Sequence, residues 1–150
     1  MRLRNCNRRA CRVALYGVAL GRKWLEMILV IGGAYQGKWD YVAENYPGKT
    51  VFQCCIENPD MDLTADIINA LHLMILAQIR AEIDTLKYLR EKLPKLKGKI
   101  VICDDISCGV VPTDSEARLW RETMGRSLSL ISKNADEVIR VFCSIGSRIK

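Results

Sequence analysis

The stretch MILVIGGAYQGKWDY, residues 27–41, decides the fold class of this chain. It begins with a continuous apolar run, MILVI, that ends at a pair of glycines, as a strand buried on both faces does when it enters a tight loop. Gly32, Gly37 and Lys38 then fit the pattern G-x-x-x-x-G-K, in which backbone N–H groups and the lysine hold phosphate. The last position of the full pattern holds Trp39, where serine or threonine would supply a hydroxyl ligand for magnesium.

Segments after this stretch alternate between short apolar runs and longer amphipathic ones. The apolar runs predict strands over residues 27–31, 50–55, 99–103 and 137–143, with a short edge strand over 146–150. Helical spacing of apolar side chains predicts helices over residues 38–46, 64–93 and 113–134, the last opened by a T-x-x-E box, Thr113 to Glu116. This alternation indicates an α/β fold: a mostly parallel sheet of the phosphate-loop type, with helices on both faces and an antiparallel C-terminal edge strand.

The net charge of +6 on the 150 residues comes from one end of the chain. Residues 1–26 hold seven basic side chains and one acidic side chain, whereas residues 27–150 hold sixteen of each. A neutral body offers no basic face, so no nucleic-acid partner is expected. We interpret residues 1–26 as a disordered leader or a spurious upstream start, with a secretory signal or an organelle presequence as alternatives. Residues 27–150 are then a single nucleotide-binding α/β domain.

Cysteine and histidine usage bears on the compartment and on metal binding. The seven cysteines form no C-x-x-C pair, and one histidine in the chain gives no zinc-ligand spacing. Scattered cysteines of odd number favour reduced thiols in a cytoplasmic protein. No run of about 18 apolar residues occurs, so no membrane span is expected.

Ligands of parallel α/β sheets bind at the carboxyl ends of the strands. Three loops meet that condition here: residues 32–38, 104–112 and 144–146. In the second loop, Asp104 and Asp105 follow a strand, where paired carboxylates can hold Mg²⁺ or accept a proton from an attacking hydroxyl. Turn formation or helix capping is the alternative role of these two aspartates.

Two further groups of side chains are open to more than one interpretation. Arg118, Glu122 and Arg126 lie at i, i+4 and i+8 with Arg121 beside them, and this spacing alone favours a solvated ladder of salt bridges. His72 has apolar helical neighbours, which favour a structural histidine.

Three segments, taken in order, resemble one enzyme family. They are MILVIGGAYQGK (27–38), DDISCGVVPTDSEARLWRETMGR (104–126) and ADEVIRVFCSIGSRIK (135–150). Together they are similar to the adenosylcobinamide kinase / adenosylcobinamide-phosphate guanylyltransferase family of cobalamin biosynthesis. That family has a strand running into a glycine-rich phosphate loop, then N-E-V-G-x-G-V-V-P, R-x-x-x-G-R, and A-D-E-V before a final apolar strand.

The resemblance implies a nucleotide-binding enzyme that uses GTP or ATP with Mg²⁺. Its reactions are phosphorylation of the aminopropanol hydroxyl of adenosylcobinamide and transfer of GMP to adenosylcobinamide phosphate, which gives GDP-cobinamide. Carried onto this chain, Lys38 and Asp105 would be catalytic, and Asp104 and Asp105 would hold the metal. The nucleotide-binding residues would be Gly32, Gly33, Ala34, Gln36, Gly37, Lys38, Arg121 and Arg126.

The chain departs from the family pattern in several places. Trp39 replaces the expected hydroxyl residue, Ser107 replaces a glycine, and the middle of the chain is shorter. The histidine that becomes guanylylated in longer members has no identifiable counterpart, and His72 does not align with it. Two hypotheses follow: an active kinase or nucleotidyltransferase, and a nucleotide-binding protein of the same fold with impaired catalysis. An apolar edge such as residues 138–143 also predicts a homo-oligomer.

Overall fold

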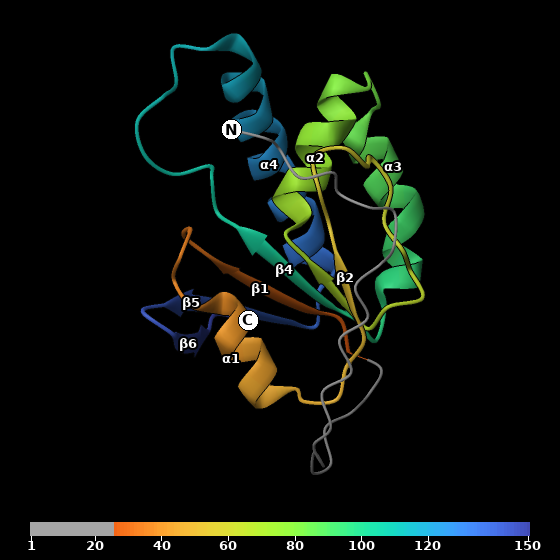
Figure 1. Ribbon diagram of the computed structural model, residues 1–150, viewed down its shortest axis with the longest axis vertical. Helices are drawn as coiled ribbons and strands as arrows, with labels where there is room; N and C mark the ends of the chain where they lie inside the picture. Colours follow the sequence, from red (N-terminus) through yellow and green to blue (C-terminus); the bar gives the residue numbers. More distant parts are fainter. Residues whose placement is uncertain (1–25) are drawn as a thin grey trace, which may run out of the picture.

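A six-stranded sheet forms the centre of the computed structural model, which describes residues 26–150 (Figure 1). Its strands are β1 (Ile28–Gly32), β2 (Val51–Gln53), β3 (Ile67–Asn69), β4 (Ile100–Asp104), β5 (Glu137–Phe142) and β6 (Ile145–Arg148). The helices are α1 (Lys38–Asn45), α2 (Leu71–Arg80), α3 (Thr85–Lys92), the 3-10 helix η1 (Leu93–Leu96) and α4 (Ser115–Asn134). The leader predicted over residues 1–26 lies, apart from Glu26, outside the described residues.

The strands follow the order β2-β3-β4-β1-β5-β6 across the sheet. Every neighbouring pair is parallel except β5 and β6, which form an antiparallel hairpin at one edge. The predicted α/β class, the mostly parallel sheet and the antiparallel C-terminal edge strand are therefore confirmed. Strand β1 lies between β4 and β5, so the loop after β1 starts next to the loop after β4.

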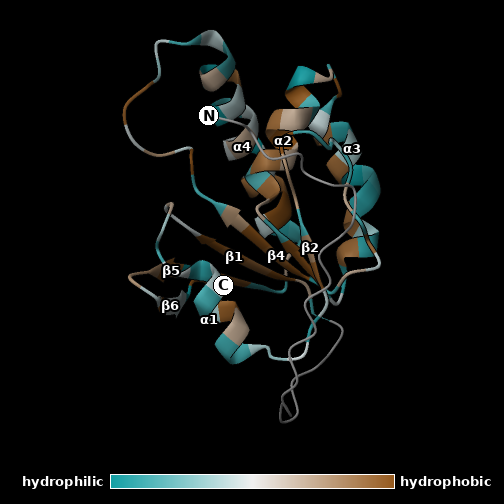
Figure 2. Cartoon of the chain, viewed as in Figure 1, coloured by the Kyte–Doolittle hydropathy of each residue, from teal (hydrophilic) through white to brown (hydrophobic). Residues whose placement is uncertain are grey.

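Apolar side chains alternate between the two faces of the central strands, which explains why continuous apolar runs form them. One core contains Leu29 of β1 and Val101 of β4 together with side chains of α2, α3 and α4. The second core contains Val30 and Ile102 from the same strands, packed with Val42 of α1. Figure 2 shows the apolar strands lying between these helices. Helices therefore cover both faces of the sheet, as predicted. Among residues 26–150, α2, α3 and α4 pack on the first core and α1 packs on the second.

The single helix predicted over residues 64–93 is wrong. This segment contains strand β3 and then helices α2 and α3, which are separated by a turn where Glu82 has a φ of 55°. Ile67 and Ile68 extend between β2 and β4 and bury one side chain in each core. Asp84 caps α3 through its carboxylate. The apolar spacing suggested one helix because Ile68 and the inner faces of α2 and α3 are buried in the same core.

Two details of the C-terminal half also differ from the prediction. Helix α4 is capped by Asp114, whose carboxylate accepts the N–H of Ala117 at 2.7 Å, and not by Thr113. The strand predicted over 137–143 is not at an edge, because β5 has β1 on one side and β6 on the other. The edge strands of the sheet are β2 and β6, and the predicted homo-oligomer stays a prediction.

Two observations bear on the predicted environment of the protein. Within residues 26–150, no helix combines the length and the apolar character needed to cross a membrane. In that range the thiols of Cys54 and Cys103 are buried, and those of Cys108 and Cys143 are exposed.

Gly32 is required by the close approach of β1 to β5. A Cβ at this position would lie 2.3 Å from the carbonyl oxygen of Val141, whereas a Cβ at Gly33 would meet only the flexible Cγ of Gln36 at 3.4 Å. We therefore expect Gly32→Ala to lower the free energy of unfolding by about 1–3 kcal/mol or more, since backbone must move to relieve the overlap. Urea denaturation measures this, with Gly33→Ala as the matched control. Equal stability of the two variants would contradict the expectation.

Candidate phosphate-binding site

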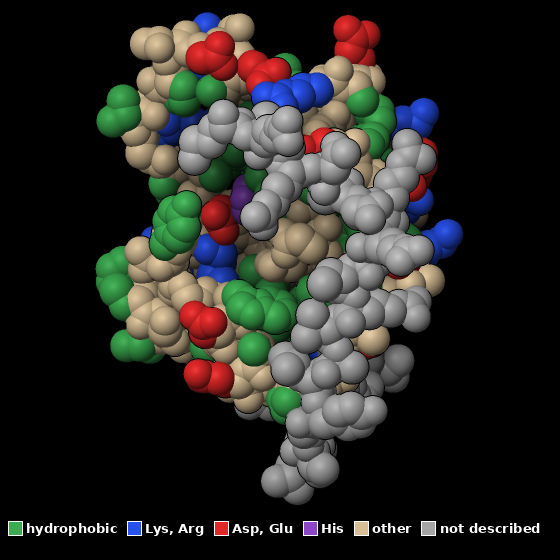
Figure 3. Space-filling model, viewed as in Figure 1, with side chains coloured by type: hydrophobic (Ala, Val, Ile, Leu, Met, Phe, Trp, Pro, Cys, Tyr) green, Lys and Arg blue, Asp and Glu red, His purple; other side chains and the backbone are tan. Residues whose placement is uncertain are grey.

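A hollow of about 490 Å³ lies at the carboxyl ends of β1, β3 and β4. Its lining comes from separate parts of the chain: Tyr35, Gln36, Gly37, Lys38, Trp39, Asp40, Asn69, Ala70, Ile102, Asp104 and Ser144. We call it the lysine hollow. On the face shown in Figure 3, the single histidine appears in purple beside acidic and basic side chains.

Lys38, the first residue of α1, is the central charge of the lysine hollow. It is 6% exposed, and its Nζ donates to the carbonyl oxygen of Gly33 at 2.6 Å and lies 2.7 Å from Oδ1 of Asp104. A buried ammonium needs such partners, because an unpaired buried charge is strongly destabilising. The predicted phosphate-loop lysine is therefore held at the end of β1, with Asp104 of β4 as its counter-ion.

The turn between β5 and β6 supports the loop over residues 32–38. Gln36 accepts the N–H of Ser144 on its carbonyl oxygen and the N–H of Cys143 on its side-chain oxygen, both at 2.8 Å. Cys143 and Ser144 both have positive φ, 49° and 63°, as a tight hairpin turn requires. Gly37 has a φ of 77°, and a Cβ there would lie 2.1 Å from Oγ of Ser144. The loop and the turn are thus packed so closely that position 37 of the loop needs glycine.

His72 belongs to α2 and lies beside Asp104, the residue that also pairs with Lys38. The backbone N–H of Asp104 donates to Nδ1 of His72 at 3.3 Å. Nε2 of His72 lies 3.8 Å from Oδ2 of Asp104. Burial lowers the pKa of His72 below its ordinary value; Asp104 opposes this shift and Lys38 adds to it. Trp120 of α4 donates its indole N–H to the carbonyl oxygen of His72 at 2.8 Å, which fixes this turn of α2.

Asp105, predicted to be catalytic, points into a different and smaller hollow of about 170 Å³. Its carboxylate accepts from the N–H and hydroxyl of Ser107, at 3.1 and 2.5 Å, and from the thiol of Cys108 at 3.3 Å. Burial disfavours the charged form, but these hydrogen bonds and the charge of Arg140 outweigh it, so the pKa of Asp105 lies below its ordinary value. Asp105 is an ionised turn residue, and Gly32 and Gly33 line the same small hollow.

The side chain of Arg121 binds the backbone of the loop that follows β4. Its guanidinium donates to the carbonyl oxygens of Ser107, Gly109 and Val110 at 2.8, 2.6 and 2.7 Å. It is thus a clamp on the loop that contains Asp105 and does not line the lysine hollow.

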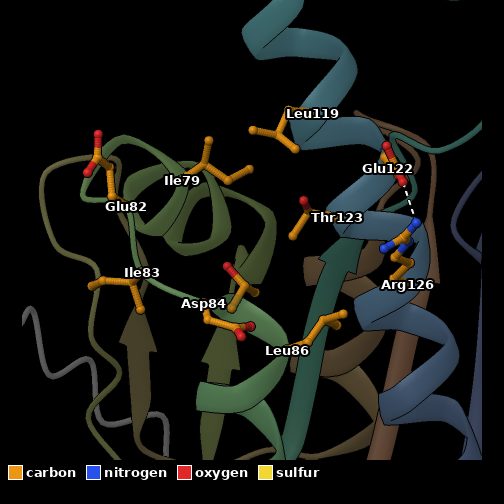
Figure 4. Close-up of a pocket in the computed structure, with 10 residues that line it drawn as sticks. Ile79, Glu82, Ile83, Asp84, Leu86, Leu119, Glu122, Thr123 and Arg126 are labelled. Carbon is orange, nitrogen blue, oxygen red and sulfur yellow. Dashed lines mark ion pairs between the residues drawn. The ribbon is translucent and has the colours of Figure 1, made fainter.

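Arg126, also predicted to bind nucleotide, lines a hollow of about 420 Å³ together with Arg121 and does not line the lysine hollow. It pairs with Glu122 at 2.5 Å, both side chains being exposed, as the salt-bridge interpretation predicts for this pair. Figure 4 shows the two residues on α4 at the side of a hollow that α4 forms with α2, α3 and their connecting turn. The structure therefore brings together Gln36, Gly37, Lys38 and Asp104 and leaves Arg126 apart.

Sequence reasoning missed Asn69 in the lysine hollow and did not place His72 beside Asp104, whereas Ser144 belongs to the predicted loop 144–146. Asn69 ends β3, the strand concealed within the predicted helix, and its amide donates to the side chain of Gln53 at 2.7 Å. The short β-branched pair Ile67-Ile68 before a polar residue was the available signal, because it is typical of a buried strand end.

Magnesium is implied by the family resemblance, but the side chains around the lysine hollow fit it poorly. Trp39 offers only an N–H donor, the Asp104 carboxylate already faces Lys38, and Asp40, the other carboxylate in the lining, is exposed on the first turn of α1. Among residues 26–150 no group of three His, Cys, Asp or Glu side chains is arranged to hold a metal ion.

The chain matches no protein-family model, and no curated protein is significantly similar to it. The family resemblance of its motifs therefore stays a prediction, and the function is inferred from the site itself.

The single histidine allows the electrostatics of this site to be measured directly. We expect proton NMR titration of the His72 ring to give a pKa below the ordinary value of 6.5. Asp104→Asn removes a charge that favours the imidazolium and should lower the pKa further, whereas Lys38→Met should raise it. Because the folded state disfavours the protonated ring, the free energy of unfolding should fall as the pH drops below 6.5. A pKa at or above that value would contradict the described burial.

Proposed function

We propose that this chain binds a nucleoside triphosphate, GTP or ATP, in the lysine hollow. The observation that carries the proposal is the placement of Lys38: a buried ammonium at the end of a parallel strand, beside a glycine-containing loop and facing a hollow. A positive charge that is largely removed from water attracts phosphate more strongly than an exposed one. Its present partners, a carbonyl oxygen and the Asp104 carboxylate, hold it in position for an anionic ligand.

The helix ends around the hollow support the same ligand. Helix α1 begins at Lys38 and α2 begins at Leu71, directly after Ala70, which lines the hollow. The first N–H groups of a helix have no partner within it, and its macrodipole favours negative charge at this end. Two such ends and one ammonium favour phosphate groups, and the volume of the hollow is within the range of small-molecule sites.

The motif resemblance extends the proposal to a reaction. In it, the aminopropanol hydroxyl of adenosylcobinamide attacks the γ-phosphorus, the bond from that phosphorus to the bridging oxygen breaks, and GDP or ADP leaves. The hydroxyl proton passes to solvent or to a carboxylate. Lys38 would stabilise charge on the transferring group, and Asp105, ionised at neutral pH, would orient the acceptor. GMP transfer to the phosphorylated product is the second activity that the resemblance implies.

One observation favours the alternative, a nucleotide-binding protein with impaired catalysis. The indole of Trp39 lines the lysine hollow at the position where a hydroxyl would hold magnesium. Binding by loop and lysine survives this replacement, whereas magnesium-assisted transfer does not have its usual ligand.

Binding is tested by titrating the full chain with fluorescent mant-GTP and mant-ATP. We expect Lys38→Met to weaken binding at least about tenfold, because a charge-assisted contact to phosphate is lost. Lys97→Met is the matched control: the same change at an exposed lysine of the described chain should leave the affinity unchanged. Since Lys38→Met leaves Asp104 without its counter-ion, the double variant Lys38→Met/Asp104→Asn shows whether lost binding reflects misfolding. Equal affinity of wild type and a folded Lys38 variant would overturn the proposal.

Turnover is tested separately with adenosylcobinamide and labelled GTP. Cobinamide phosphate or GDP-cobinamide as product supports the enzyme, and the Lys38→Met rate should be at least about a hundredfold lower, in the range of other lost charge-stabilising groups. Nucleotide binding without either product supports the alternative instead.

A further inference from the structure

The residue after the phosphate-loop lysine sets the metal requirement of this site. A hydroxyl there would be a magnesium ligand, but the chain has Trp39, which is 37% exposed and lines the lysine hollow. An indole has one N–H donor and no lone pair to offer a cation. The position therefore contributes a bulky aromatic wall and no metal ligand.

The carboxylate paired with Lys38 is also unsuited to a second cation, and Asp40, the other carboxylate in the lining, is exposed on the first turn of α1. Oδ1 of Asp104 lies 2.7 Å from Nζ of Lys38, and the two side chains are 23% and 7% exposed. A divalent ion on this carboxylate would stand next to a buried ammonium, and like charges at such a distance repel each other. Its other oxygen, Oδ2, faces His72 at 3.8 Å. Asp104 thus acts as the counter-ion of Lys38.

The second carboxylate is turned away from the first. Asp105 lines the small hollow with Gly33 and Arg140, while Asp104 lines the lysine hollow. Ser107 donates to Oδ1 of Asp105, and the thiol of Cys108 donates to Oδ2. The two aspartates therefore do not form a shared ligand set, although they are adjacent in sequence.

We infer that the lysine hollow binds the nucleotide in its metal-free, fully ionised form. Lys38 and the N-terminal ends of α1 and α2 take the place of magnesium in neutralising the phosphates, and Trp39 occupies the space near the loop. The inference rests on the proposed nucleotide binding and specifies the chemical form of the ligand: free GTP or ATP, in place of the magnesium complex. Magnesium then competes with the protein for the phosphates.

Calorimetric titration of the full chain with GTP, and separately with ATP, tests this inference. One series contains excess EDTA and the other saturating Mg²⁺. We expect affinity in EDTA to equal or exceed that in Mg²⁺, with binding in both series weakened by Lys38→Met. Binding that is at least about tenfold tighter with Mg²⁺ would overturn the inference and leave the proposed function standing. Absence of binding in both series would overturn the two together.

Three variants make the interpretation specific. Trp39→Ser restores the missing hydroxyl and should shift the preference toward the magnesium complex, whereas Trp39→Phe, which restores no oxygen, should keep the preference of the wild type. Asp104→Asn should strengthen binding in EDTA, because a negative charge beside the phosphates is removed. If Asp104 were a metal ligand, the same substitution would instead weaken binding in Mg²⁺ and leave the EDTA series unchanged, which would contradict the inference.

Discussion

Strand β1 has a parallel partner on each side and a helix-covered core on each face, and the rest of the domain is arranged around this constraint. Such a strand can expose no polar side chain, so its sequence is apolar throughout and only its last residue can begin a functional loop. The partner strands also fix what lies beside that loop. Strand β4 brings Asp104 next to Lys38, and β5 brings the turn that supports Gln36.

The sequence was sufficient to predict the strands and helices whose apolar pattern matches the side chains that are buried in the structure. Apolar runs at residues 27–31, 99–103 and 137–143 and the helix over 113–134 correspond to β1, β4, β5 and α4. Residues 64–93 could not be divided correctly, because a three-residue strand between two partners is stabilised by long-range pairing and leaves little periodicity of its own. The register that stabilises β3 is a property of β2 and β4, which lie elsewhere in the chain.

The same distinction applies to the site. The loop and Lys38 could be identified from a contiguous motif, whereas the pairing of Lys38 with Asp104 depends on strand order. Neighbouring aspartates suggested one acidic site, yet Asp104 and Asp105 line separate hollows, because successive residues at a strand end point in different directions. Arg121 was assigned to the ligand by resemblance, while its geometry makes it a holder of loop 107–110.

The contact between Gly37 and Ser144 has a consequence for the energetics of ligand capture. Because the turn at Cys143 and Ser144 holds Gln36 through two hydrogen bonds and leaves no room for a side chain at Gly37, loop 32–38 is shaped without any ligand. The entropy cost of ordering this loop then arises when the β5–β6 hairpin folds and not when a ligand binds. A substitution in the C-terminal hairpin would therefore change the shape of a loop more than a hundred residues earlier in the chain, and with it the affinity for the proposed ligand, without touching that ligand.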